Sequence, residues 1–104
     1  MKSNIKINKK RLVNSIEEMA KIGATPKGGV NRQALTDLDK ISRDLFVKWC
    51  NREKLKVKID EMGNIFARRK GKKNFLPPIM SGSHLDTQPT GAADESDPRA
   101  RPAC

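Results

Sequence analysis

Residues 37–53 constrain the fold more than any other part of this sequence, because their apolar side chains recur at helical spacing. The apolar stripe consists of Leu38, Ile41, Leu45 and Trp49, and it is widened by Phe46 and Cys50. Thr36 precedes the stripe and is followed three residues later by Asp39, a variant of the capping box that begins a helix. The pattern therefore predicts a helix whose apolar stripe packs in a core, with Cys50 as a small buried residue.

A second amphipathic helix is expected over residues 8–22, with Asn8 as its N-cap and Gly23 at its end. The glycine- and proline-containing segment 23–34 then reads as a loop.

Residues 55–59 alternate apolar and basic side chains, as a half-buried strand does. The stretch 60–64 has turn composition, and 65–69 reads as the return strand. The two strands predict a hairpin with basic side chains on its outer face, namely those of Lys56, Lys58 and Arg68.

A third, short apolar strand is expected over residues 79–84, after two prolines. Gly82 is expected to let other backbone approach this strand closely. The predicted order α-α-β-β-β begins an α/β fold, and ligands of open α/β sheets gather outside the carboxyl ends of strands. His84 would lie at such an end.

The chain has 104 residues, which suits one small domain, and a net charge of +10. That charge would suit nucleic acid, and the basic run at residues 68–73 could neutralise several phosphates. Only three Phe and one Trp are present, however, and Phe46 and Trp49 belong to the predicted helix face, which leaves little for base stacking. A nucleic-acid-binding module is therefore kept as an alternative, and nucleic acid is not the expected partner.

The sequence contains no secretory signal and no run of apolar residues long enough for a transmembrane helix. Its two cysteines, Cys50 and Cys104, have neither zinc-knuckle nor disulfide-framework spacing. We therefore expect a cytoplasmic protein without a membrane partner.

His84 is the only histidine, and Asp86 follows two residues later. A carboxylate so placed can bond the ring nitrogen of a metal-bound histidine that does not face the metal. The alternative interpretation is a surface histidine near a turn, with Asp86 and Thr87 capping the next segment.

The stretch SGSHLDTQPTG, residues 81–91, resembles the first metal-ligand motif of the zinc-dependent amidohydrolases related to aminoacylases and di-metal carboxypeptidases. Within that group it is similar to the branch of N-carbamoyl-L-amino acid hydrolase, β-ureidopropionase and allantoate amidohydrolase. Residues 28–50 and 57–72 are similar to the same branch, in the same order and at the same spacing. The resemblance covers residues 10–91 and implies the N-terminal part of a three-layer α/β/α catalytic domain.

The resemblance also implies roles for individual residues. His84 matches the first histidine ligand of a di-metal centre, Asp86 matches the aspartate that orients it, and Gln88 is at most a wall of the active site. Arg32 falls in a shared motif without an assigned role. The stretch 88–90 is more similar to the carbamoylases and β-ureidopropionases than to the allantoate enzymes.

For the full-length protein the resemblance implies a homodimer that hydrolyses a small ureido or amide substrate such as an N-carbamoyl amino acid. Two zinc ions would activate the attacking water, with manganese or cobalt as alternative metals.

The match ends at Gly91. The family pattern continues to an Asp-Gly step whose aspartate bridges the metals, and this step is missing here, so Asp94, Glu95 and Asp97 receive no metal role. Residues 92–104 contain no Leu, Val, Ile or Phe and are expected to be a disordered, non-family tail, from a changed reading frame or a fusion. We therefore divide the chain into residues 1–91 and 92–104. We expect an incomplete, marginally stable domain that is inactive alone, with a non-functional truncated product as a further interpretation.

Overall fold

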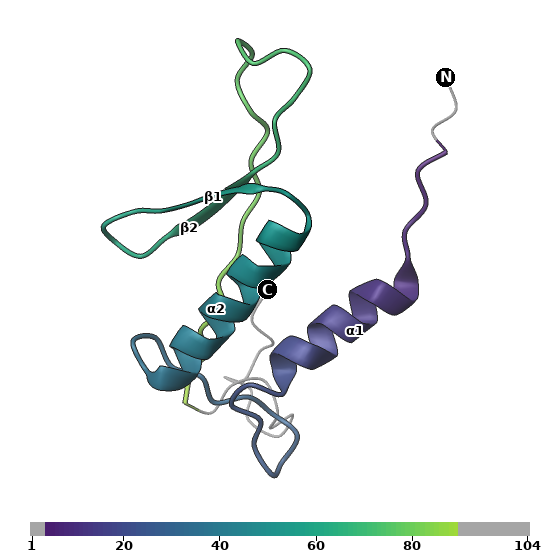
Figure 1. Cartoon of the computed structure of the whole chain (residues 1–104). Helices are drawn as coiled ribbons and strands as arrows, with labels where there is room; N and C mark the ends of the chain where they lie inside the picture. The colour runs from purple at the N-terminus through teal and green to yellow at the C-terminus, as the bar shows by residue number, and fades with distance from the viewer. Residues whose placement is uncertain (1–3, 90–104) are drawn as a thin grey trace.

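The computed structural model describes residues 4–89, which form two helices and one two-stranded antiparallel sheet (Figure 1). The elements are α1 (Lys9–Ala20), α2 (Asp37–Arg52), β1 (Lys56–Ile59) and β2 (Ile65–Arg68). The expected disordered tail, residues 92–104, lies outside the described residues. Within residues 4–89 no helix is long and apolar enough to cross a membrane.

Helix α2 begins as predicted but buries a different face. The backbone N–H of Asp39 donates to Oγ1 of Thr36 at 3.2 Å, which confirms the cap. The buried positions of α2 are Asp39, Ser42 and Cys50, whereas Ile41 of the predicted stripe is 51% exposed. Cys50 is therefore buried as predicted, but the rest of the predicted stripe is exposed or only partly covered where α2 packs against β1. The other two buried positions lie one residue after members of the stripe, so that part of the predicted core face was wrong.

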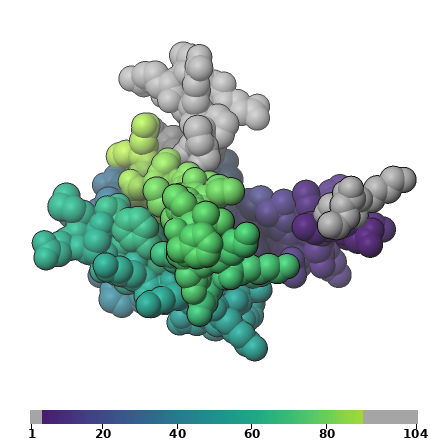
Figure 2. Space-filling view, turned by 90° about the horizontal axis from the view of Figure 1, so that it is seen from above, coloured from purple at the N-terminus to yellow at the C-terminus, as the bar shows by residue number. Residues whose placement is uncertain are grey.

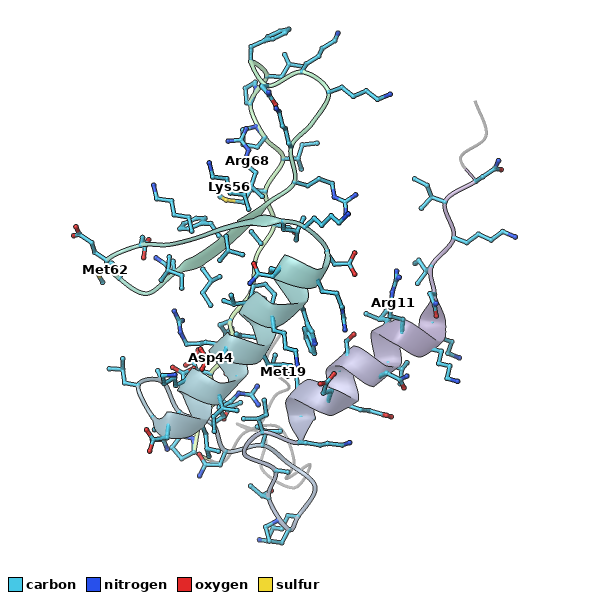
Figure 3. The ribbon with its side chains drawn as sticks, in the orientation of Figure 1. Arg11, Met19, Asp44, Lys56, Met62 and Arg68 are labelled. Carbon is cyan, nitrogen blue, oxygen red and sulfur yellow. The ribbon has the colours of Figure 1, made fainter. Side chains whose placement is uncertain are left out.

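The predicted hairpin is confirmed, and the structure adds its antiparallel register. Lys56 pairs with Arg68 and Ile59 with Ile65, and Figure 3 shows Lys56 and Arg68 together on the hairpin with Met62 near its tip. The side chains of Lys56, Lys58 and Arg68 are exposed, as expected. The guanidinium of Arg43 donates to the carbonyl of Gly63, which ties α2 to the hairpin turn.

Helix α1 is capped as predicted, because the backbone N–H of Arg11 donates to Oδ1 of Asn8 at 3.0 Å. After the helix, Gly23 adopts φ +85°, and its carbonyl accepts from the backbone N–H of Asn31 at 2.8 Å. This bond brings the two ends of the loop together. The apolar face of α1 is largely uncovered, with Leu12 53% and Ile16 61% exposed.

The predicted third strand does not form within residues 4–89. Residues 79–84 have no strand conformation, and Ile79 is fully exposed. A strand needs a hydrogen-bonding partner, and the hairpin pairs only β1 with β2. Gly82 was expected to permit a close backbone approach, but none of the described atoms lies within 4 Å of the position that a Cβ would take there. Figure 2 shows the segment after β2 (green) lying on the outside of the molecule.

Candidate metal-ligand site

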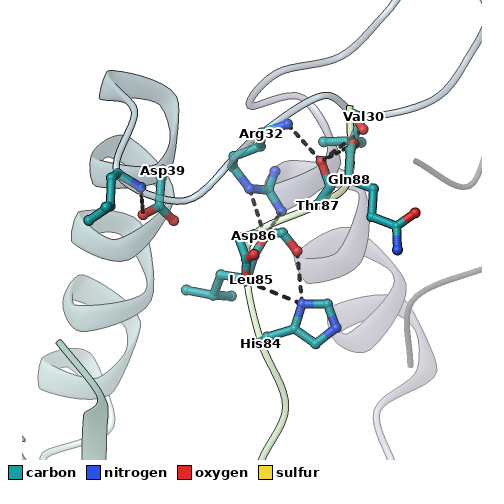
Figure 4. Close-up of polar contacts among 9 residues, drawn as sticks. Val30, Arg32, Asp39, His84, Leu85, Asp86, Thr87 and Gln88 are labelled. Carbon is teal, nitrogen blue, oxygen red and sulfur yellow. Dashed lines mark hydrogen bonds and ion pairs between the residues drawn. The ribbon is translucent and has the colours of Figure 1, made fainter. Parts of the chain in front are cut away.

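His84 and Asp86 lie in an extended segment that passes beside α2 (Figures 1 and 4). Nδ1 of His84 lies 2.8 Å from the backbone carbonyl oxygen of Asp86 and 3.4 Å from Oδ1 of its carboxylate. A carbonyl oxygen only accepts, so the bond requires the proton on Nδ1. In the neutral ring this tautomer leaves the lone pair on Nε2, the atom that a metal would need.

Both side chains are accessible. The imidazole of His84 is 52% exposed and the Asp86 side chain 45% exposed, so a ligand could reach either one. Gln88, the expected wall residue, is also exposed. His84 and Asp86 are in contact, as expected, although the closer partner of Nδ1 is the backbone carbonyl oxygen of Asp86 and not its carboxylate.

The segment is held in place by Arg32, which is only 6% exposed. Its Nε and Nη2 both donate to the carbonyl of Leu85, at 3.0 and 2.8 Å. Its Nη1 donates to the carbonyls of Met19 and Ile22 at 2.9 and 2.6 Å. These last two carbonyls belong to the end of α1 and the turn after it, where a cation also complements the helix dipole.

Thr87 adds a second attachment (Figure 4). Its backbone N–H donates to the carbonyl of Arg32, and its Oγ1 accepts from the backbone N–H of Arg32, both at 2.7 Å. The same hydroxyl donates to the carbonyl of Val30 at 3.1 Å. Leu85 and Thr87, on either side of Asp86, are thus both attached to the loop that carries Arg32.

Electrostatics around Arg32 combine two opposing effects. Burial lowers the pKa of the guanidinium, while the charges of Asp39 and Asp86 act in the opposite direction. An arginine stays protonated under ordinary conditions, so the group is a permanent, largely desolvated cation. Its hydrogen bonds to carbonyl oxygens compensate for the lost water.

The described residues do not complete a metal site. Within residues 4–89, no group of three or more His, Cys, Asp or Glu side chains is arranged to hold a metal ion. A zinc site needs three or four ligands from the protein, and His84 supplies one. No catalytic step through a metal can therefore be derived from these residues alone.

The sequence indicated His84, Asp86 and Gln88 but missed the contacts that place them. Arg32 and Leu85 are 53 positions apart, and Val30 and Thr87 are 57 apart. The sequence marks Arg32 only as part of a motif shared with the amidohydrolases. A lone arginine in a glycine-containing loop gave no signal of burial, because arginines are mostly exposed.

Comparisons with known proteins connect these features to one group of enzymes. The chain is 49% identical over 88 residues to an N-carbamoyl-L-amino-acid amidohydrolase of Rhizobium meliloti, which covers 85% of the chain and 21% of that protein. It is 31% identical over 87 residues to a ureidoglycolate hydrolase of Arabidopsis thaliana, covering 84% of the chain and 18% of that protein. The chain thus spans about one fifth of the length of these relatives. No family model matches it.

Comparison with solved structures points to the same group of enzymes. A hydantoinase/carbamoylase family amidase from Burkholderia multivorans superposes with a TM-score of 0.83 at 56% identity, covering 88% of this chain and 22% of that one. The two helices and the hairpin are therefore arranged as in part of that amidase fold.

Proposed function

Because the chain is homologous over most of its length to the N-carbamoyl-L-amino-acid amidohydrolases, we propose that it carries the first metal-ligand corner of an amidohydrolase site. In this proposal His84 is a metal ligand through Nε2, and Asp86 orients its ring. The observation that carries the proposal is the bond of 2.8 Å from Nδ1 of His84 to the Asp86 carbonyl, because it leaves Nε2 with the lone pair.

The proposed reaction class is hydrolysis of a non-peptide C–N bond in an N-carbamoyl amino acid or a related ureido compound. The names of the relatives support this class, since one acts on N-carbamoyl-L-amino acids and another on ureidoglycolate. The metal, which we propose to be zinc, would supply an activated water to such a site when bound. His84 would hold it, Asp86 would fix the ring of His84, and Gln88 would border the substrate.

For the 104-residue chain by itself we propose weak metal binding and no hydrolysis. One histidine cannot replace three or four ligands, and residues 4–89 provide no further cluster.

A zinc titration of the metal-free chain tests this proposal. Because His84 is the only histidine, its imidazole gives a single set of NMR signals that reports directly on metal contact. We expect these signals to shift with a dissociation constant weaker than micromolar, and we expect no turnover of an N-carbamoyl amino acid.

The matched control is His84→Ala, which should remove the weak zinc binding that calorimetry detects in the unaltered chain. Zinc binding that persists unchanged in His84→Ala would show that His84 is not the ligand. Submicromolar binding or turnover by the unaltered chain would show that its site is complete.

A further inference from the structure

We propose that Arg32 is a positioning residue for His84, which acts by clamping the backbone of residues 85–87 to the end of α1. The inference rests on the proposed function at one point only, namely that a metal ligand needs a fixed imidazole. The clamp itself, and its effect on the ring of His84, do not depend on any metal.

The guanidinium makes four hydrogen bonds that join two distant parts of the chain. Two go to the carbonyl of Leu85, and two go to the carbonyls of Met19 and Ile22. An aliphatic side chain of the same length would leave all three of these carbonyls without this partner. The fork geometry of arginine suits such a junction, whereas the single ammonium group of lysine does not.

The clamp acts on the residues that alternate with the candidate site residues. Leu85 is attached through its carbonyl, and Thr87 is attached through its hydroxyl and its backbone N–H. The side chains of His84 and Asp86 take no part in these bonds and stay about half exposed. Figure 4 shows the two attachments and the imidazole next to Asp86.

This arrangement determines the orientation of the imidazole. The bond from Nδ1 of His84 to the carbonyl of Asp86 spans only two residues, and Leu85 lies between its ends. Its geometry therefore depends on the backbone conformation at Leu85, which Arg32 holds. Without the clamp the exposed segment would sample other conformations, and the ring would lose the contact that keeps the proton on Nδ1.

The ring tautomer of His84 in the metal-free 104-residue chain tests the proposal. Nitrogen-15 NMR of the single imidazole, at a pH where it is neutral, gives the ratio of the Nδ1–H and Nε2–H tautomers. A peptide of residues 81–89 supplies the ratio without a clamp. We expect the chain to show an excess of the Nδ1–H form, and we expect Arg32→Met to lose this excess and give the ratio of the peptide.

Arg43→Met is the matched control, because Arg43 also donates to a distant carbonyl, that of Gly63, but not to the segment of His84. It should keep the ratio of the unaltered chain. A general loss of stability would affect both variants, whereas loss of the clamp affects only Arg32→Met.

The proposal is overturned if Arg32→Met keeps the unaltered ratio, or if the unaltered chain already has the ratio of the peptide. If Arg32→Met loses the amide signals of α2 and the hairpin, Arg32→Lys decides. That variant keeps the positive charge but cannot make the paired bonds from Nε and Nη2 to the carbonyl of Leu85, and an unchanged ratio in it would equally refute the clamp. Zinc binding is measured separately, so failure of the clamp is distinguishable from failure of His84 as a ligand.

Discussion

At the scale of single residues, the most buried side chains of the described chain are mostly polar. Arg32, Asp39 and Ser42 are 6%, 9% and 0% exposed, while Cys50 is the one apolar side chain of residues 4–89 that is buried. Every buried polar side-chain atom of residues 4–89 has a hydrogen-bond partner. The centre of this structure therefore depends on complete hydrogen bonding, and the removal of one partner leaves another group unsatisfied.

Substitutions at Gly23 and Gly28 can distinguish the cost of backbone strain from the cost of a steric clash with a neighbouring atom. Gly23 and Gly28 both have φ near +85°, where an L-residue costs about 1–2 kcal/mol. A Cβ at Gly23 would lie 2.6 Å from the carbonyl oxygen of Asn31, whereas none of the described atoms lies within 4 Å at Gly28. We predict that Gly23→Ala lowers the free energy of unfolding by about 1–3 kcal/mol more than Gly28→Ala.

Urea unfolding followed by the fluorescence of Trp49, the single tryptophan, measures both variants. Gly28→Ala is the matched control, since it carries the same backbone strain without the contact. Equal losses in the two variants would contradict the close approach of residues 23 and 31.

The caps of both helices could be predicted from the sequence, but the role of Arg32 could not. A cap joins residues three positions apart, as Thr36 and Asp39 do, so its signal is local. The bonds of Arg32 to Leu85 join residues 53 positions apart, and no short pattern encodes such a pairing. For the same reason the sequence indicated a contact between His84 and Asp86 but not what fixes their backbone.

At the scale of elements, the sequence predicted the helices and strands whose backbone hydrogen-bonding partners are adjacent along the chain. The two helices and the hairpin β1–β2 satisfy their backbone hydrogen bonds within themselves or with the next element. Residues 79–84 had strand-like composition but found no partner strand within residues 4–89. The buried positions of α2 differ from most of the predicted stripe for a related reason, because periodicity defines a stripe but not the neighbour that covers it.

The hairpin turn should respond to pH through Asp60. Its carboxylate accepts from the side chain of Asn64 at 2.9 Å and from the backbone N–H groups of Asn64 and Met62 at 2.8 and 3.0 Å. These bonds lower the pKa of Asp60 below its ordinary value of 3.8, with the Asn64 side chain as the largest cause. A carboxyl group with a lowered folded-state pKa stabilises the fold above its unfolded pKa, and this stabilisation is lost as the pH falls through the folded pKa.

We therefore predict that the turn keeps its structure down to about pH 4 and loosens below it. Amide NMR signals of Gly63 and Asn64 would report the change. In Asp60→Asn this pH response should disappear, because the amide does not titrate. Asp37→Asn, which removes another exposed carboxylate, should leave the response intact. If Asp60→Asn loosens at the same pH as the unaltered chain, other titrating groups cause the change.

At the scale of the whole molecule, large apolar side chains remain open to solvent on several elements. Ile16 of α1 and Ile41 of α2 are more than half exposed, and Phe75 is 82% exposed in the loop after β2. A chain with a single buried apolar side chain among residues 4–89 gains little from hydrophobic burial. These faces fit the expectation of marginal stability, and the Burkholderia multivorans amidase that shares this fold is about four times as long as this chain.

The central claim is that His84 acts as a metal ligand of an amidohydrolase site. A chimaera tests it most directly, in which the aligned segment of this chain replaces its counterpart in the Rhizobium meliloti relative. The remaining ligands would then come from the relative, so that both metal content and hydrolysis become measurable. Lys48→Ala, which alters an exposed side chain of α2, serves as the control variant.

The decisive measurement is the metal content and the rate of N-carbamoyl amino acid hydrolysis of this chimaera with and without His84→Ala. We predict that the chimaera and its Lys48→Ala variant hydrolyse the substrate, whereas His84→Ala lowers kcat/KM at least about 100-fold and loses bound metal. A His84→Ala chimaera that keeps the full rate and the full metal content would contradict the claim.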